Sequence, residues 1–143
     1  MSIEYLRGLQ TQCEFHEPAS LDRITLAEER LGVKFPDDLR SALCESDGVL
    51  GEYGLGLLWN VDRIEQDNLD FRRRPAFKEL YMPFDHLLFI ADAGNGDQFA
   101  YGIRANGHID ASDIFAWDHE NDGRAWCASD LRNYMDWCIS REL

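Results

Sequence analysis

The chain turns back on itself in the stretch Phe89-Ile90-Ala91-Asp92-Ala93-Gly94-Asn95-Gly96-Asp97-Gln98-Phe99-Ala100-Tyr101. Two apolar runs flank a Gly-Asn-Gly-Asp corner, and glycine and asparagine tolerate the positive φ angles that a tight turn requires. We therefore predict a β-hairpin whose structural turn consists of Gly94, Asn95 and Gly96. Because a hairpin reverses the chain within a few residues, we expect Asp92 and Asp97 close together at one edge of a sheet.

A second apolar run also ends in acidic residues. It reads Ile114-Phe115-Ala116-Trp117-Asp118-His119-Glu120 and continues to Asp122 and Gly123. Carboxylates gathered beside an exposed tryptophan form either a protein-binding surface or a metal site. Ligand spacing and the charge of the chain distinguish these two interpretations.

Strand and helix patterns extend on both sides of the hairpin. Apolar and polar residues alternate over residues 98–103, and an Asn106-Gly107 turn signal precedes a further strand at residues 114–117. Ser129 and Asp130 then begin a closing helix. Upstream, the pattern predicts helices over residues 26–31, 37–46 and 61–69 and a strand at residues 57–59. For the first helix, Thr25 and Glu28 fit a capping box.

The composition is that of one folded domain with a strong negative charge. The 143 residues suffice for one core, and a 12% aromatic content is typical of a chain that folds. The formal net charge of −13 repels phosphate backbones and anionic lipids, so we expect no direct binding of nucleic acid or membranes. The charge favours a basic protein partner, although it also has a plain alternative explanation in solubility. The arginines at positions 72–74 are expected to pair with neighbouring carboxylates.

Targeting signals and cysteine usage point to the cytoplasm. Residues 1–7 contain no apolar core of signal-peptide length, and no later segment approaches a membrane span. The four cysteines are scattered without a Cys-x-x-Cys pair, so we expect reduced thiols in a cytoplasmic protein.

The sequence predicts no metal, no cofactor and no catalytic residue. Cys13 and His16 have a ligand-like spacing, but no second pair completes a tetrahedral site. Asp118-x-Glu120-x-Asp122-Gly123 resembles the opening of a calcium loop, but Ser129 stands where the bidentate carboxylate is needed. No nucleophile elbow or phosphate-binding glycine loop accompanies the histidines and carboxylates. A calcium-binding protein or a hydrolase that uses these carboxylates remains an alternative.

The order of the motifs resembles the SUKH superfamily, which includes yeast regulators of cell-wall assembly and killer-toxin resistance and many bacterial immunity proteins. Leu26-Ala27-Glu28-Glu29-Arg30-Leu31-Gly32-Val33-Lys34-Phe35-Pro36-Asp37-Asp38-Leu39 is similar to the opening of that family. Asp47-Gly48 stands where the family usually has Asn-Gly, and the hairpin and the Trp-Asp-His-Glu strand end follow in the family's order. The resemblance spans about residues 22–142 of a single domain at residues 1–143.

The resemblance implies an α+β fold, a mostly antiparallel β-sheet with helices packed against it. It also implies a non-enzymatic protein-binding module, an immunity protein that neutralises a basic toxin domain, in some cases a nuclease. A regulatory or scaffold protein of the cell-wall-assembly type is the alternative. Neither the partner nor the oligomeric state follows from the sequence.

Charge and resemblance together predict a binding face at the ends of the strands. Opposite charges accelerate encounter, and a buried aromatic anchor contributes much of the affinity of a protein complex. The alternative is that Trp117 belongs to the core and that the carboxylates cap turns. The residues expected on or beside the binding face are Asp92, Asp97, Trp117, Asp118, Glu120 and Asp122.

Overall fold

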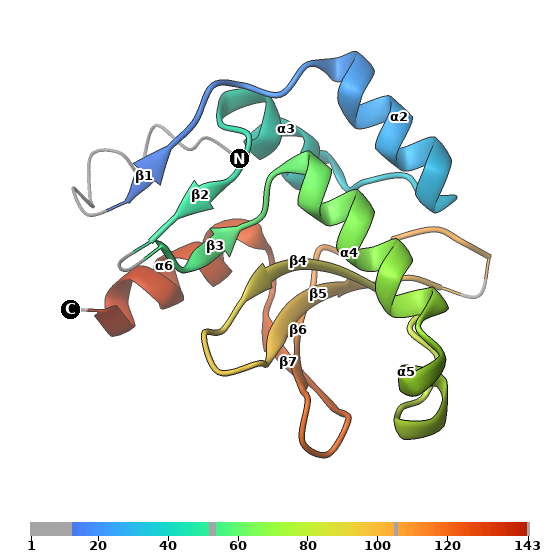
Figure 1. Cartoon of the computed structure of the whole chain (residues 1–143). Helices are drawn as coiled ribbons and strands as arrows, with labels where there is room; N and C mark the ends of the chain where they lie inside the picture. Colours follow the sequence, from blue (N-terminus) through green and yellow to red (C-terminus); the bar gives the residue numbers. More distant parts are fainter. Residues whose placement is uncertain (1–12, 52–53, 105, 143) are drawn as a thin grey trace.

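The computed structural model describes residues 13–51, 54–104 and 106–142, which form five helices and two antiparallel sheets (Figure 1). The predicted α+β class is therefore confirmed, with two sheets where the sequence suggested one. Residues 1–7, in which no signal-peptide core is expected, lie outside the described ranges.

The first helix begins earlier than its capping box predicts. Helix α2 (Leu21–Leu31) starts at the N-cap Ser20, whose side chain accepts a hydrogen bond from the Arg23 amide at 3.1 Å. Thr25 therefore lies inside the helix, and the capping-box prediction is wrong. Glu28 has a different role, since its Oε2 accepts a hydrogen bond from the Phe35 amide at 2.7 Å and fixes the connection to the next helix.

A small sheet and a second helix complete the N-terminal half. Helix α3 (Asp37–Glu45) follows Pro36, as predicted. The sheet has the order β1-β2-β3 and consists of β1 (Glu14–Phe15), β2 (Val49–Leu50) and β3 (Gly56–Leu58).

Helix α4 (Val61–Arg73) is longer than predicted, and α5 (Pro75–Leu80) was not predicted. Proline at the first position of α5 has no amide hydrogen to lose, which explains the break between the helices. The expected pairing of the basic cluster holds for Arg74, which pairs with Asp70. Arg72 instead donates to the backbone carbonyl of Leu31 at 3.1 Å.

The larger sheet has the order β4-β5-β6-β7, and each neighbouring pair is antiparallel. The β4–β5 hairpin is confirmed: Gly94 and Gly96 have φ angles of 95° and 96°, and Asn95 Oδ1 accepts a hydrogen bond from the Asp97 amide at 3.1 Å. The last strand of the sheet was not predicted. The four strands are β4 (Leu87–Asp92), β5 (Gln98–Gly102), β6 (Ile114–Asp118) and β7 (Gly123–Ala128).

Helices cover both faces of this sheet (Figure 1). On one face, the Phe71 ring of α4 packs against Phe89 and Trp117, with centroids 5.3 and 5.9 Å apart. At the β4 edge, Asn68 of the same helix pairs with the backbone of Phe89, donating to its carbonyl at 2.9 Å and accepting from its amide at 2.8 Å. On the other face, Tyr134 of α6 (Leu131–Glu142) packs 4.8 Å from the ring of Phe99 and donates to the Leu57 carbonyl of β3 at 2.9 Å.

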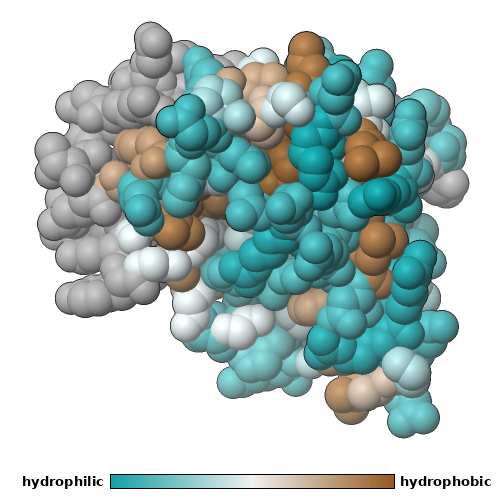
Figure 2. All heavy atoms as spheres, turned by 45° about the horizontal axis from the view of Figure 1, so that its top comes forward, coloured by the Kyte–Doolittle hydropathy of each residue, from teal (hydrophilic) through white to brown (hydrophobic). Residues whose placement is uncertain are grey.

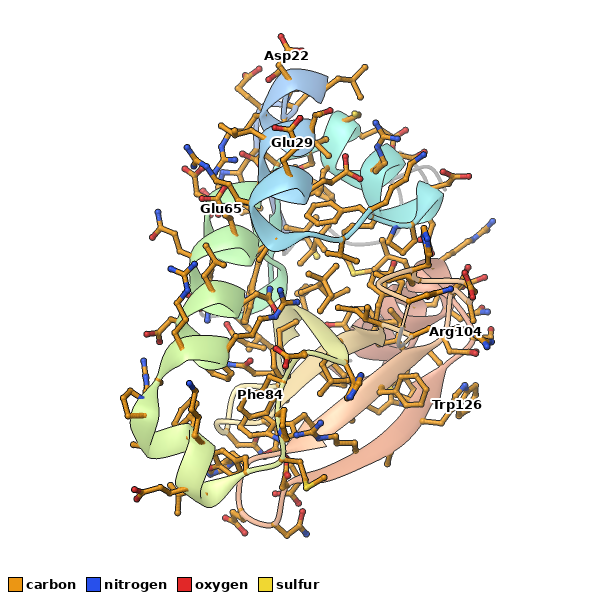
Figure 3. The ribbon with its side chains drawn as sticks, turned by 90° about the vertical axis from the view of Figure 1, so that its right-hand side faces the viewer. Asp22, Glu29, Glu65, Phe84, Arg104 and Trp126 are labelled. Carbon is orange, nitrogen blue, oxygen red and sulfur yellow. The ribbon has the colours of Figure 1, made fainter. Side chains whose placement is uncertain are left out.

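The buried side chain of Glu65 joins α4 to α2 (Figure 3). Its two carboxylate oxygens lie 2.9 Å from Arg23 and 3.0 Å from Arg30. Both ends of the carboxylate are thus neutralised by cations of the neighbouring helix, which permits a charged group to lie at the interface.

Candidate functional site

Two turns of the larger sheet lie together at the end opposite α2 (Figure 1). The β4–β5 turn contributes Asp97 and the β6–β7 turn contributes His119. Asp97 Oδ1 accepts a hydrogen bond from the His119 amide at 3.0 Å and lies 2.7 Å from its Nδ1. Gly96 leaves room for this contact, because a Cβ there would lie 2.9 Å from His119 Cε1.

The pairing shifts the proton affinities of both side chains. The hydrogen bond with Asp97 raises the pKa of His119, and the same bond lowers the pKa of Asp97. Each shift favours the charged form of its residue, so a protonated imidazole and an ionised carboxylate stabilise one another across the two turns.

Asp118 and Glu120 stand at the beginning of the β6–β7 turn. Asp118 Oδ1 accepts a hydrogen bond from the Glu120 amide at 2.9 Å, and the Glu120 side chain is exposed. Neither carboxylate forms an ion pair with another described residue. We call Asp97, Asp118 and Glu120 the acidic turn face.

Asp97, Asp118 and His119 could also serve as ligands of a divalent cation. One ligand atom of each lies within 4.8 Å of the others, and this is the one such group within the described ranges. Three protein ligands plus water is a coordination typical of zinc, whereas calcium takes six to eight oxygens. His119 Nδ1 is engaged with Asp97, which leaves Nε2 as the ring nitrogen for an ion.

Asp122 stabilises the fold instead of contributing to an ion site. It has a positive φ of 59°, and its Oδ2 accepts a hydrogen bond from the Met82 amide at 2.8 Å. Its Oδ1 accepts hydrogen bonds from Trp117 Nε1 at 2.8 Å and from Arg124. Burial alone would raise its pKa, but these bonds outweigh burial and lower it. Residues 123–128 form strand β7, so the segment that follows Asp122 is not the remainder of a calcium loop.

Trp117 is buried, with 3% of its surface exposed, so the prediction of an exposed anchor at this residue is wrong. It lies in the cross-strand row Gln98–Trp117–Arg124, which faces α4 and α5. Its ring packs edge-on against aromatic side chains from three segments: Phe71, Tyr81, Phe84 and Phe89. The alternative prediction, that this strand aromatic belongs to the core, describes the structure.

Asp92 faces away from the acidic turn face. It belongs to the same hairpin as Asp97, but its two oxygens accept hydrogen bonds from Arg63 of α4 at 2.8 and 2.9 Å. The Arg63 guanidinium in turn lies 4.1 Å above the ring of Trp59. The hairpin thus places both aspartates at one end of the ladder but directs their carboxylates to different partners.

Sequence reasoning missed two residues of this region, His119 as the partner of Asp97 and Trp126 as an exposed aromatic. Trp126 lies on β7 with 61% of its surface exposed and points away from the ribbon (Figure 3). Its only signal in the sequence was a tryptophan outside any predicted strand. The role of His119 could have been predicted by placing the ends of the two predicted strands side by side, which brings His119 near Asp97.

The chain matches one protein-family model over most of its length. The family model SUKH_6, described as SMI1-KNR4 cell-wall, matches residues 21–135, from the first residue of α2 into α6. No curated protein sequence matches the chain. Within the described ranges, no helix has the length and apolar character needed to cross a membrane.

Proposed function

Because the chain belongs to the SMI1-KNR4 (SUKH) family, we propose that it is a non-enzymatic immunity protein, which neutralises a basic toxin domain by binding it through an acidic surface. A toxin that acts on nucleic acid needs a basic cleft, and a protein with a net charge of −13 is attracted to such a cleft. The proposal places the protein in the cytoplasm, in keeping with its four cysteines, none of which forms a disulfide.

The acidic turn face is the observation that carries this proposal. Glu120 is exposed, Asp118 is half-buried, and both are free of ion pairs with the described residues. Asp92 and Asp122, in contrast, already bind arginines within the protein, and Trp117 is buried. We therefore assign partner contact to Asp118 and Glu120 and a structural role to Asp92, Trp117 and Asp122, while Asp97 holds the two turns of this face together through His119.

The contacts of His119 support a binding role over catalysis. Its Nδ1 is held by Asp97, and among the described residues no serine or cysteine is hydrogen-bonded to its ring. A carboxylate and a histidine without an adjacent nucleophile lack the arrangement of a hydrolytic triad. The remaining surface visible in Figure 2 is dominated by hydrophilic residues, with hydrophobic ones in separate patches.

The proposal can be tested with the product of the neighbouring reading frame, expressed together with this protein and titrated by calorimetry. We expect Glu120→Lys to weaken the complex about tenfold, or about 1.4 kcal/mol, because it replaces attraction by repulsion at the contact. The matched control is Asp22→Lys, an equal charge change at an exposed site on α2, at the opposite end of the molecule (Figure 3).

The comparison of the two variants decides the outcome. Loss of affinity confined to Glu120→Lys supports the acidic turn face. Equal losses for both variants would mean that net charge alone attracts the partner, and no loss for either would refute the assignment.

The description of the matching family model, SMI1-KNR4 cell-wall, favours a second candidate. This is a regulatory or scaffold protein that binds an endogenous partner. It is distinguished by the absence of a toxin-like reading frame beside the gene and by a partner that is not toxic when produced alone.

A further inference from the structure

Strand β7 is the last strand of the larger sheet, because the order β4-β5-β6-β7 leaves one of its sides without a neighbouring strand in the described ranges. Ala125 and Trp126 are consecutive residues and both are exposed. Successive side chains of a strand point to opposite faces, so solvent reaches both faces of β7 at this position. The backbone groups on its outer side are those that another strand can pair with.

Strand β7 lacks lysine and proline, two of the usual protections of an edge strand. Proteins shield such edges with short strands, lysines, prolines or bulges. This strand has six residues, Gly-Arg-Ala-Trp-Cys-Ala, without proline or lysine. Its one charged residue, Arg124, is turned back onto the protein, where it binds Asp122 and the carbonyls of Met82 and Pro83. The register with β6 shifts between Ile114 and Phe115, which makes Cys127 an extra residue of β7 between Trp126 and Ala128.

Trp126 is held in place at this edge. Its Nε1 donates a hydrogen bond to Asp113 at 3.2 Å, and across the ladder it pairs with the half-buried Phe115. Tryptophan is one of the side chains enriched at the energetic centre of protein interfaces. Figure 3 shows Trp126 directed away from the strands.

We propose that the outer edge of β7 accepts an extended strand of a protein partner, with Trp126 packing against an apolar side chain of that strand. This inference rests on the proposed function and names the mode of binding, the addition of a strand to the sheet.

The charges at both ends of β7 define the chemistry of the incoming strand. Asp118 and Glu120 lie at the end where β7 begins, and Asp113 and Asp130 lie near the end where it stops. The strand that fits has an apolar centre and lysine or arginine on both flanks. A second copy of this chain is disfavoured, because each copy carries a net charge of −13 and the two would repel one another.

The test uses a random-peptide phage library selected against the whole protein. We expect enriched peptides to alternate apolar and polar residues between basic flanks, and to perturb amide resonances of β7. We expect Trp126→Ala to weaken their binding at least tenfold. The matched control is Trp137→Ala, which removes a tryptophan that is 40% exposed on α6. Trp126 is mostly exposed, so its variant should keep the melting temperature of the wild-type protein.

Three results would overturn the inference. They are enriched peptides that bind Trp126→Ala as tightly as the wild type, a selection that enriches no such peptide, and a dimer of the protein that Trp126→Ala dissociates. The last would assign the edge to a second copy. If the basic partner binds Trp126→Ala with unchanged affinity, the inference that β7 accepts a strand is wrong and the proposed function stands. If no basic partner binds the wild type, the proposed function fails, and the peptides still test the edge.

Discussion

Two residues expected on the binding face, Trp117 and Asp122, bind each other. Most buried indole N–H groups have an acceptor, because an unpaired buried donor destabilises a protein by about 1–3 kcal/mol. Asp122 supplies that acceptor from a left-handed backbone conformation, which aspartate adopts more readily than most residues. The sequence therefore suggests a surface charge at Asp122, but in the structure its carboxylate accepts the hydrogen bond of the buried Trp117 indole.

At the same scale, the Asp97–His119 contact predicts a pH dependence. Asp97 has a lowered pKa, so its contribution to stability is present above its unfolded pKa of 3.8 and is lost as the pH falls through the lowered value. His119 has a raised pKa, so its contribution is present below 6.5 and is lost as the pH rises through the raised value. The link between the two turns is complete between pH 3.8 and 6.5.

NMR titration of the His119 imidazole checks this prediction. In the wild type we expect a midpoint above 6.5, and in Asp97→Asn we expect it to move down, because the ionised acceptor of its hydrogen bond is gone. An identical midpoint in both proteins would show that Asp97 does not influence the histidine.

At the scale of elements, the tight turn could be predicted from local sequence, whereas the exposed edge strand could not. The β4–β5 hairpin was predictable because its glycines mark the positive φ angles directly. Strand β7 was not, because exposure on both faces removes the alternation by which a half-buried strand is recognised. The pattern likewise ended α4 four residues early, since only its packed face carries the signal.

Replacing Gly96 with alanine tests the hairpin corner. A side chain at a φ of 96° strains the backbone by about 1–2 kcal/mol. The new Cβ also displaces the His119 ring from Asp97. Urea denaturation should show a larger loss of stability than for the control Gly32→Ala, which has a φ of 69° and no atom within 4 Å of the added carbon. Equal losses in the two variants would mean that the ring adapts without penalty.

At the scale of the whole molecule, Asn68 joins the helical layer to the larger sheet. Its amide is buried and takes the place of a strand beside Phe89, whose amide and carbonyl it binds, while it also donates to the Ile64 carbonyl of its own helix at 2.6 Å. A fully satisfied buried network of this kind specifies one packing of helix on sheet.

We therefore expect Asn68→Ala to lower the free energy of unfolding by about 3 kcal/mol, because two backbone groups of β4 lose their partner. The control is Gln66→Ala, an exposed position of the same helix, which should change stability by about 0.5 kcal/mol or less. Chemical denaturation measures both. A similar change in the two variants would indicate that water replaces the amide at Phe89.

The sequence by itself determined the α+β class, the central hairpin, the order of most elements and the strongly acidic character of the protein. The α+β class follows from the family resemblance, and the other features follow from local turn residues, periodicity and composition, none of which requires knowledge of distant contacts. The family motifs are read in the same way, and the match over residues 21–135 confirms them.

Only the tertiary structure decided which carboxylates remain available. Asp92 pairs with Arg63, which lies 29 residues away in the sequence, and Asp122 pairs with Arg124. Asp118 and Glu120 have no ion-pair partner among the described residues. It also buried Trp117 and exposed Trp126, because the position of a strand within its sheet, and not its sequence, determines which of its side chains face other elements.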